Sequence, residues 1–306
     1  MQGFDNLHNR VLKICSQSLA TPFSLLFNFI FSSEEYPTVW RTATVIPLLK
    51  TGSQTGSPNL SSNCSVTFSQ SFWETFTQTY LQLPTTPLIP NNSGCRKKHS
   101  TLNSLLSTCN NLYQAHDSNL SCRILFLDIS KACNCVDHKC LLFKIQELGM
   151  DGPLLNLWSS YLSQRSQVFL INRTLSDLKY TSCGVPQGSV LGPLLFLICV
   201  NDIAKNINAS ISLFADNTTL YYSAKCPIHL HRVLPQDLST LCNWWKVWNI
   251  NFNPSKTAVM TIYNLRNVHP PLFFNNTHLS ETDTHKHLVN SAQSCCRFLL
   301  QTKQSQ

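Results

Sequence analysis

Apolar residues recur along this chain with the two spacings of regular secondary structure. Segments in which they return every three or four positions are predicted to be helices, and short apolar or alternating segments between turn-forming residues are predicted to be strands. The predicted helices are two within 7–32, separated at Pro22, then 101–114, 138–148, 152–163, 189–207 and 234–248. The predicted strands are 44–50, 122–129, 167–172, 179–182, 210–215, 218–223 and 258–263.

Two segments follow neither spacing. Residues 51–64 are rich in Ser, Gly, Asn and Thr and are predicted to be a loop, whereas 83–92 is proline-rich and is expected to be an extended connector. The longest apolar run, 190–200, is interrupted by Gly192 and Pro193 and is shorter than the ~18 residues of a membrane span. We therefore expect no membrane partner.

Composition changes this picture only modestly. The chain has 306 residues, of which 43% are hydrophobic, enough for one large or two small domains with a core. Charged residues make up 12%, well below the ~25% of soluble domains, and the net charge is +8. That charge permits a nucleic-acid partner without a strongly basic signature.

The 14 cysteines do not indicate a disulfide framework or a zinc site. Disulfide frameworks belong mainly to short secreted chains, and no secretory signal is recognised at residues 1–16. Neither Cys133 with Cys135 nor Cys295 with Cys296 has zinc-ligand spacing. We expect free thiols in a reducing, intracellular compartment, the nucleus or the cytoplasm.

Two carboxylates at strand ends suggest chemistry. Asp128 ends one predicted strand, and Asp216 stands at the tip of the hairpin formed by 210–215 and 218–223. Either one alone is more often a helix cap or a solvated turn. Between them, 183–196 (CGVPQGSVLGPLLF) is a glycine- and proline-shaped loop that enters a helix start and favours an anionic ligand. Together they fit a site for two Mg²⁺ ions about 4 Å apart, which catalyses phosphoryl transfer.

Three motifs in this order, 127–138 (LDISKACNCVDH), 183–196 and 214–217 (FADN), resemble the reverse transcriptase of non-LTR (LINE-like) retrotransposons. The resemblance covers roughly residues 5–289. It implies an α+β fold, a right-hand polymerase palm with fingers and a truncated thumb. It also implies an N-terminal and fingers region at 1–121, a palm at 122–289 and an unassigned tail at 290–306.

The resemblance implies a role for each motif residue. Asp128 matches the catalytic Asp of the first palm motif, Asp216 and Asn217 match its Asp pair, and Lys256 matches the lysine that assists pyrophosphate departure. The implied metal ligands, for Mg²⁺ or Mn²⁺, are Asp128, Ile129 and Asp216. Lys256 could instead be an ordinary solvated lysine.

The resemblance also implies nucleotide and template contacts. Gln187 and Gly188 match the loop beside the incoming nucleotide and template, Lys50 and Arg96 match fingers residues, and Cys133 matches the position beside the ribose. Lys50 and Arg96 could equally be plain solvated residues. The implied partners are an RNA template, a DNA primer and deoxynucleoside triphosphates, and no protein partner is predicted.

Several positions depart from the family pattern. Asn217 replaces an Asp; if the lost charge is worth about 3–4 kcal/mol in the transition state, the rate falls about 10²–10³-fold. Cys133 replaces an aromatic residue that blocks the ribose 2′-OH, and Ser62 stands where a fingers arginine is expected. These changes predict an impaired RNA-directed DNA polymerase. Two alternatives stay open: a catalytically dead remnant that at most binds RNA or RNA–DNA hybrid, and an interaction protein that keeps the palm as a scaffold.

Overall fold

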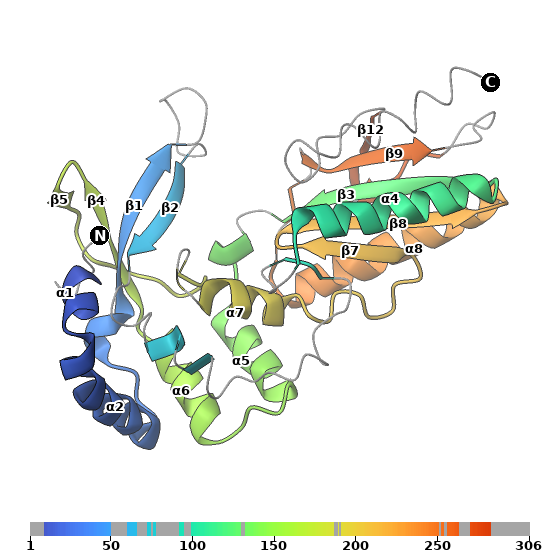
Figure 1. Cartoon of the computed structure of the whole chain (residues 1–306). Helices are drawn as coiled ribbons and strands as arrows, with labels where there is room; N and C mark the ends of the chain where they lie inside the picture. The colour runs from blue at the N-terminus through green and yellow to red at the C-terminus, as the bar shows by residue number, and fades with distance from the viewer. Residues whose placement is uncertain are drawn as a thin grey trace. The chain divides into compact units, whose positions relative to one another are not determined.

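The computed structural model describes residues 9–49, 60–65, 72–74, 76–77, 92–94, 99–129, 132–186, 189, 191–250, 252–253, 256–262 and 270–282. The chain forms two compact units that interleave along the sequence. The first comprises Met1–Pro87 and Cys133–Cys199, and the second comprises Leu88–Ala132 and Val200–Gln306. Both units combine helices with mainly antiparallel sheet, which confirms the α+β class (Figure 1). The boundaries predicted at residues 121 and 289 between the fingers region, the palm and the tail stay predictions.

The second unit is built on a five-stranded sheet in the order β12-β9-β3-β8-β7. Its strands are β3 (Ser121–Asp128), β7 (Ser210–Phe214), β8 (Asn217–Ala224), β9 (Ala258–Ile262) and β12 (Ser280–Glu281). The central strand β3 pairs antiparallel with both β8 and β9, and β12 joins the edge parallel to β9. Every residue of β3 is buried except its last, Asp128, which lies at the end of the sheet.

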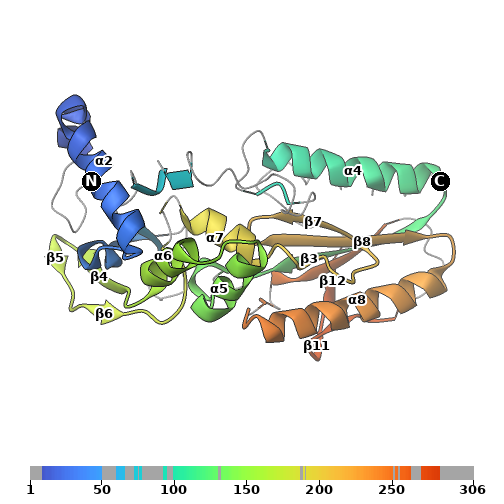
Figure 2. The same ribbon diagram turned by 90° about the horizontal axis from the view of Figure 1, so that it is seen from below.

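Two helices cover opposite faces of this sheet, α4 (Thr101–Asp117) and α8 (Pro227–Val247) (Figure 2). Because strand side chains alternate between faces, Cys122, Ile124 and Phe126 pack in one cluster with Leu112 of α4. The alternate residue Arg123 points to the other face. A small hairpin of β10 (Phe273–Phe274) and β11 (Thr277–His278) packs against α8 there.

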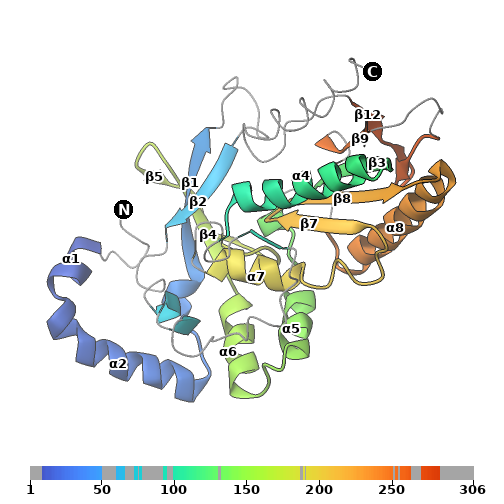
Figure 3. The same cartoon turned by 45° about the vertical axis from the view of Figure 1, so that its right-hand side comes forward.

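The first unit has a smaller sheet and several helices. Its strands are β1 (Thr42–Leu49), β2 (Leu60–Ser65), β4 (Ser166–Ile171), β5 (Thr174–Leu175) and β6 (Lys179–Tyr180). Its helices are α1 (Asn9–Ile14), α2 (Ser16–Ser33), α5 (His138–Glu147), α6 (Pro153–Leu162) and α7 (Leu191–Cys199), with short 3₁₀ turns η1 (Thr38–Arg41) and η3 (Ala132–Asn134). Helices α5 and α6 pack together (Figure 3). Aromatic side chains form the core beside α6, where the rings of Trp73 and Trp158 stack with centroids 5.0 Å apart.

Four sequence predictions of secondary structure are wrong, one of them the start of the helix predicted at 234–248, because α8 begins at Pro227. The break expected at Pro22 falls at Cys15, and α2 continues through Pro22. Pro22 denies the carbonyl of Ser18 its helical partner, but Ser18 is exposed, so water can satisfy that carbonyl. The predicted loop 51–64 contains part of β2, because the backbone of β1 supplies an antiparallel partner whatever the side chains of β2 are.

The helix predicted at 189–207 is also wrong in length, because α7 ends at Cys199. The chain continues in tight turns, in which Ile203 donates to Val200 and Lys205 donates to Asp202. The chain passes from the first unit to the second at this point, so the apolar residues that follow are buried in a different core. Among the helices that the structure describes, none is long and apolar enough to cross a membrane.

Candidate active site

The hairpin of β7 and β8 presents Asp216 on a tight turn. Phe214 and Asn217 are the last paired residues, so Ala215 and Asp216 form the whole turn. Ala215 has a φ of 53°, which is the conformation required at the first position of a type II′ turn. Gly94 packs directly against this turn, since a Cβ at Gly94 would lie 2.1 Å from the backbone nitrogen of Ala215. The turn is therefore held from outside by a position where only glycine fits.

Strand pairing brings three polar side chains together at this end of the sheet. Asp128 lies directly opposite Asn217 in the β3–β8 ladder, so their side chains leave the same face with Cβ atoms about 5 Å apart. The backbone N–H of Ile129 donates to the carbonyl of Asp216 at 3.3 Å. The amide of Asn217 donates to Oδ1 of Asp216 at 3.4 Å, a long and therefore weak bond.

Lys256 joins this group from the segment after α8. Its Nζ lies 3.3 Å from Oδ2 of Asp128, whose side chain is 18% exposed, whereas that of Lys256 is 64% exposed. Asn253 holds the segment in place, because its N–H donates to the carbonyl of Asp128 at 2.9 Å and its own carbonyl accepts from the N–H of Lys256. Phe252 pairs with Ile129 in an isolated antiparallel bridge. All four predicted catalytic residues thus lie together in one unit.

The ligand chemistry of this site suits a hard divalent cation. Two carboxylates are present, and Ile129, whose side chain is buried, can offer only its backbone carbonyl. Oxygen ligands of this kind are what Mg²⁺ prefers. No group of three or more His, Cys, Asp and Glu side chains that could hold a metal ion occurs among the described residues. The site therefore fits a divalent metal, with one carboxylate fewer than an Asp at position 217 would give.

The first unit contains the loop predicted to meet the nucleotide. Gly184 has a φ of 87°, and a Cβ there would lie 2.9 Å from the carbonyl oxygen of Asn134, so the position requires glycine. Val185 donates to the carbonyl of Cys133 at 2.7 Å, and a ring nitrogen of His138 lies 2.7 Å from the carbonyl oxygen of Gly184. These bonds join the loop to the segment that carries Cys133, whose side chain is half-buried.

A hollow of about 410 Å³ in the first unit adjoins this loop. Its lining includes Asn134, Gly184 and Pro186, which neighbour the predicted positions in sequence, and Tyr180 on β6. Lys50, Arg96, Gln187 and Gly188 lie outside the described residues, and their roles stay predictions.

In the described part of the second unit, two buried charged residues, Asp237 and Arg123, escaped the sequence analysis. Asp237 of α8 is fully buried and accepts bonds from the backbone N–H groups of Asn208 and Ala209, which lead into β7. Its signal was a carboxylate on the apolar stripe of a helix, between Leu234 and Leu238.

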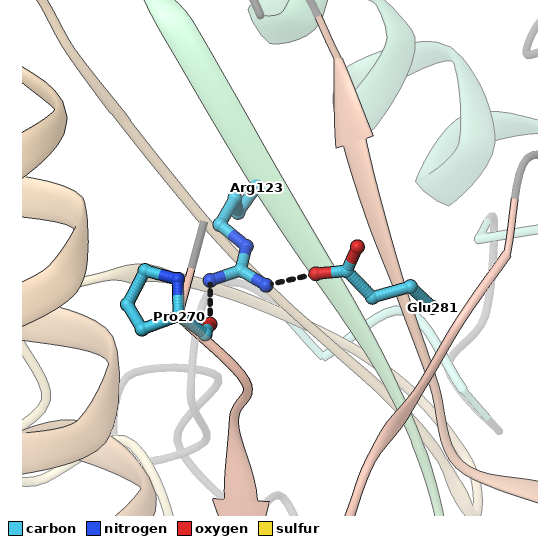
Figure 4. A network of polar contacts seen from close by, with 3 residues as sticks. All are labelled: Arg123, Pro270 and Glu281. Carbon is cyan, nitrogen blue, oxygen red and sulfur yellow. Dashed lines mark hydrogen bonds and ion pairs between the residues drawn. The ribbon is translucent and has the colours of Figure 1, made fainter. Parts of the chain in front are cut away.

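The second such residue is Arg123. Its signal in the sequence was a single cationic residue inside an apolar strand. Its side chain is completely buried, pairs with Glu281 of β12 and donates to the carbonyl of Pro270 at 3.2 Å (Figure 4). Burial lowers the pKa of Arg123, and the carboxylate of Glu281 opposes that effect. The pair fastens the edge of the sheet to its central strand.

Comparisons with known proteins agree with this geometry. Residues 73–301 match the family described as reverse transcriptase (RNA-dependent DNA polymerase). The chain is 29% identical over 300 residues to a probable RNA-directed DNA polymerase from transposon BS of Drosophila melanogaster, covering 94% of this chain and 33% of that protein. It is 28% identical to the RNA-directed DNA polymerase from mobile element jockey of Drosophila funebris, covering 94% and 32%. The chain thus spans about a third of the length of these curated relatives.

Solved structures show the same fold at low sequence identity. Apo telomerase from Candida tropicalis, truncated from its C-terminal domain, matches with a TM-score of 0.52 and 13% identity, over 82% of this chain and 57% of that one. Telomerase of the same organism in complex with a TWJ fragment of telomeric RNA matches with a TM-score of 0.53 and 11% identity, over 84% and 46%. These matches are consistent with the predicted palm and fingers. With three quarters of its length matched, the chain belongs to the reverse transcriptase (RNA-dependent DNA polymerase) family, and its relatives from transposable elements support a LINE-like reverse transcriptase.

Proposed function

We propose that this chain carries the palm of an RNA-directed DNA polymerase whose nucleotidyl transfer is impaired at Asn217. The observation that carries the proposal is the assembly of Asp128, Asp216, Asn217 and Lys256 at one end of one sheet. The relatives named above support the choice of reaction.

In this proposal Asp128, Asp216 and the carbonyl of Ile129 hold Mg²⁺ or Mn²⁺. When bound, such ions would supply the positive charge that activates a primer 3′-hydroxyl and stabilises a leaving pyrophosphate. The chain's own part is to fix the two carboxylates rigidly. The tight turn buttressed by Gly94 fixes Asp216, and the ladder with β8 fixes Asp128.

Lys256 has the position and chemistry of a leaving-group acid. Its ammonium group is exposed and lies against Asp128, where a departing pyrophosphate would gain negative charge. An ammonium group there can donate a proton or simply neutralise that charge. The contact with Asp128 favours this role over that of a plain solvated lysine.

Asn217 weakens the site in two ways. It lacks the carboxylate charge that would attract a divalent cation. Its amide N–H also donates to Oδ1 of Asp216 and so occupies a lone pair that could otherwise bind the cation. A loss of about 3–4 kcal/mol in the transition state lowers the rate about 10²–10³-fold.

The proposed substrates are an RNA template, a DNA primer and deoxynucleoside triphosphates. The net charge of +8 favours polyanions, and a telomerase with the same fold is described in complex with RNA. Cys133 is the proposed contact of the ribose, with relaxed discrimination against ribonucleotides, and Gln187 and Gly188 are the proposed contacts of nucleotide and template.

Primer extension on poly(rA)/oligo(dT) with Mg²⁺ or Mn²⁺ tests the proposal. We expect extension above that of an Asp128→Ala control, and a rise of about 10²–10³-fold with Asn217→Asp. Lys225→Met, an exposed lysine outside the site, is the matched control and should change nothing. No extension by the Asn217→Asp variant would refute the polymerase proposal.

The alternative, a dead remnant that binds nucleic acid, is favoured by the same Asn217. It predicts no extension by either protein, together with salt-sensitive retention of a primer–template duplex in filter binding. Retention that does not weaken with added salt, or no retention, would count against it.

A further inference from the structure

A hydrogen bond from the side chain of His138 holds the carbonyl group of Gly184, and none of the roles assigned above uses His138. Its Nε2 lies 2.7 Å from the carbonyl oxygen of Gly184. Because a carbonyl oxygen can only accept, Nε2 carries the hydrogen and donates it. Both residues are half-buried, so water competes for this bond only in part.

The position of His138 is fixed by the start of α5. His138 is the first residue of this helix, and Asp137 before it caps the helix through the N–H groups of Lys139 and Cys140. The imidazole therefore comes from a rigid element, whereas the carbonyl that it holds belongs to a loop.

Gly184 is the residue at which this loop has most freedom to rotate. Its φ of 87° is a value that glycine adopts without strain. Val185 is more restricted, because its side chain is β-branched and Pro186 follows it. The N–H of Gly184 donates to the carbonyl of Val136 at 2.7 Å, which restrains the φ of Gly184. The bond from His138 to the carbonyl of the same residue restrains its ψ.

The orientation of Gly184 determines where two parts of the proposed nucleotide site lie. The next N–H, that of Val185, donates to the carbonyl of Cys133 at 2.7 Å, and Cys133 is the proposed contact of the ribose. The proposed nucleotide and template contacts at 187–188 follow directly in the sequence. We propose that His138 is a positioning residue for the incoming nucleotide, acting through Gly184 on the ribose contact and on the loop at 187–188. This inference rests on the function proposed above.

Two substitutions separate the hydrogen bond from the shape of the side chain. His138→Leu has a similar size and no donor, whereas the side-chain amide of His138→Gln can still donate to the carbonyl of Gly184. Leu and Gln have similar helix propensities, so both variants should keep α5. His229→Leu, at an exposed position of α8, is the matched control.

Hydrogen exchange tests the restraint without any polymerase activity. In His138→Leu the amide of Val185 should exchange about three- to tenfold faster, the factor that one lost hydrogen bond gives in a local opening equilibrium. The amide of Leu141, which donates to the carbonyl of Asp137 within α5, should be unchanged. His138→Gln and His229→Leu should leave both amides as they are. Unchanged exchange of Val185 in His138→Leu, or equally faster exchange of Leu141, would overturn the proposal.

Nucleotide kinetics test the positioning itself. In the Asn217→Asp background, His138→Leu should raise the KM for dTTP about three- to tenfold and change kcat less than about twofold, because the carboxylates that would hold the metal lie on other segments. His138→Gln should restore the KM. An unchanged KM in His138→Leu, or no rescue by His138→Gln, would refute the positioning role. No extension by Asn217→Asp alone would refute the proposed function, and the exchange measurement would then decide by itself whether His138 restrains the loop.

Discussion

The buried pair of Arg123 and Glu281 should show a strong asymmetry when either partner is removed. The guanidinium group is completely buried, whereas the Glu281 side chain is 53% exposed. Among the described residues, Glu281→Ala leaves the buried charge of Arg123 with the carbonyl of Pro270 as its hydrogen-bond partner. Arg123→Met removes that charge, and the remaining carboxylate can be solvated where it stands.

The exposure of the two side chains sets the expected losses of unfolding free energy. Breaking a fully buried pair from one side costs about 3–5 kcal/mol, but the exposure of Glu281 screens part of the interaction, so we expect about 2 kcal/mol for Glu281→Ala. That loss lowers Tm by about 4–8 °C. Arg123→Met should stay within about 1 kcal/mol of the original protein, because an apolar side chain fits an otherwise apolar strand.

Urea unfolding of the two single variants and the double variant measures this difference. In the Arg123→Met background, Glu281→Ala should cost almost nothing, which gives a coupling free energy of about 2 kcal/mol. Glu147→Ala, at an exposed position of α5, is the matched control and should stay within about 0.5 kcal/mol. The reasoning fails if Arg123→Met costs as much as Glu281→Ala, or if the two losses add.

Three further predictions concern other positions. Gly94→Ala should destabilise the protein by about 1–3 kcal/mol in urea unfolding and abolish extension, because its Cβ would overlap the backbone of Ala215, whereas Ser93→Ala should do neither. Asp137→Ala should cost about 1 kcal/mol at pH 7, since Asp137 caps α5. The N–H of Cys140 lowers the pKa of Asp137, so the difference in urea midpoint should persist above pH ~4 and vanish as pH falls through the lowered value. Burial raises the pKa of Cys122 to about 12, so iodoacetamide should spare Cys122 in the native protein and modify exposed Cys183 first, as peptide mass spectrometry would show.

Local sequence patterns predict the secondary structure correctly wherever a segment's own residues determine it. The strand ending at Asp128 and the hairpin around Asp216 were predicted almost residue for residue, because an apolar run and a short polar turn leave few alternatives. The helix starting at Thr101 was equally clear, and Ser100 caps it through the N–H of Asn103.

Prediction from the sequence fails where contacts with distant segments determine the structure. Nothing near Gly94 in sequence indicates that it packs against Ala215, and nothing near Asn253 indicates that it supports Asp128. Ser62, a polar residue in a polar segment, lies in a strand because its segment pairs along β1 from Thr44 to Leu49. These contacts are long-range, and single-sequence periodicity carries no information about them.

The contacts of position 217 give a final prediction, that the proposed loss of activity at Asn217 is chemical and not structural. Asn217→Asp places a third carboxylate opposite Asp128 and beside Asp216. Each new like-charge pair at about 5 Å costs about 1 kcal/mol in a solvated site, so the variant should be about 1–2 kcal/mol less stable without metal. Mn²⁺ binds the folded state only, and at 100 times its Kd it should return about 2.7 kcal/mol, more than the repulsion took away. Thermal unfolding with and without Mn²⁺ measures both effects. If Asn217→Asp gains no more from Mn²⁺ than the original chain does, position 217 does not face the metal.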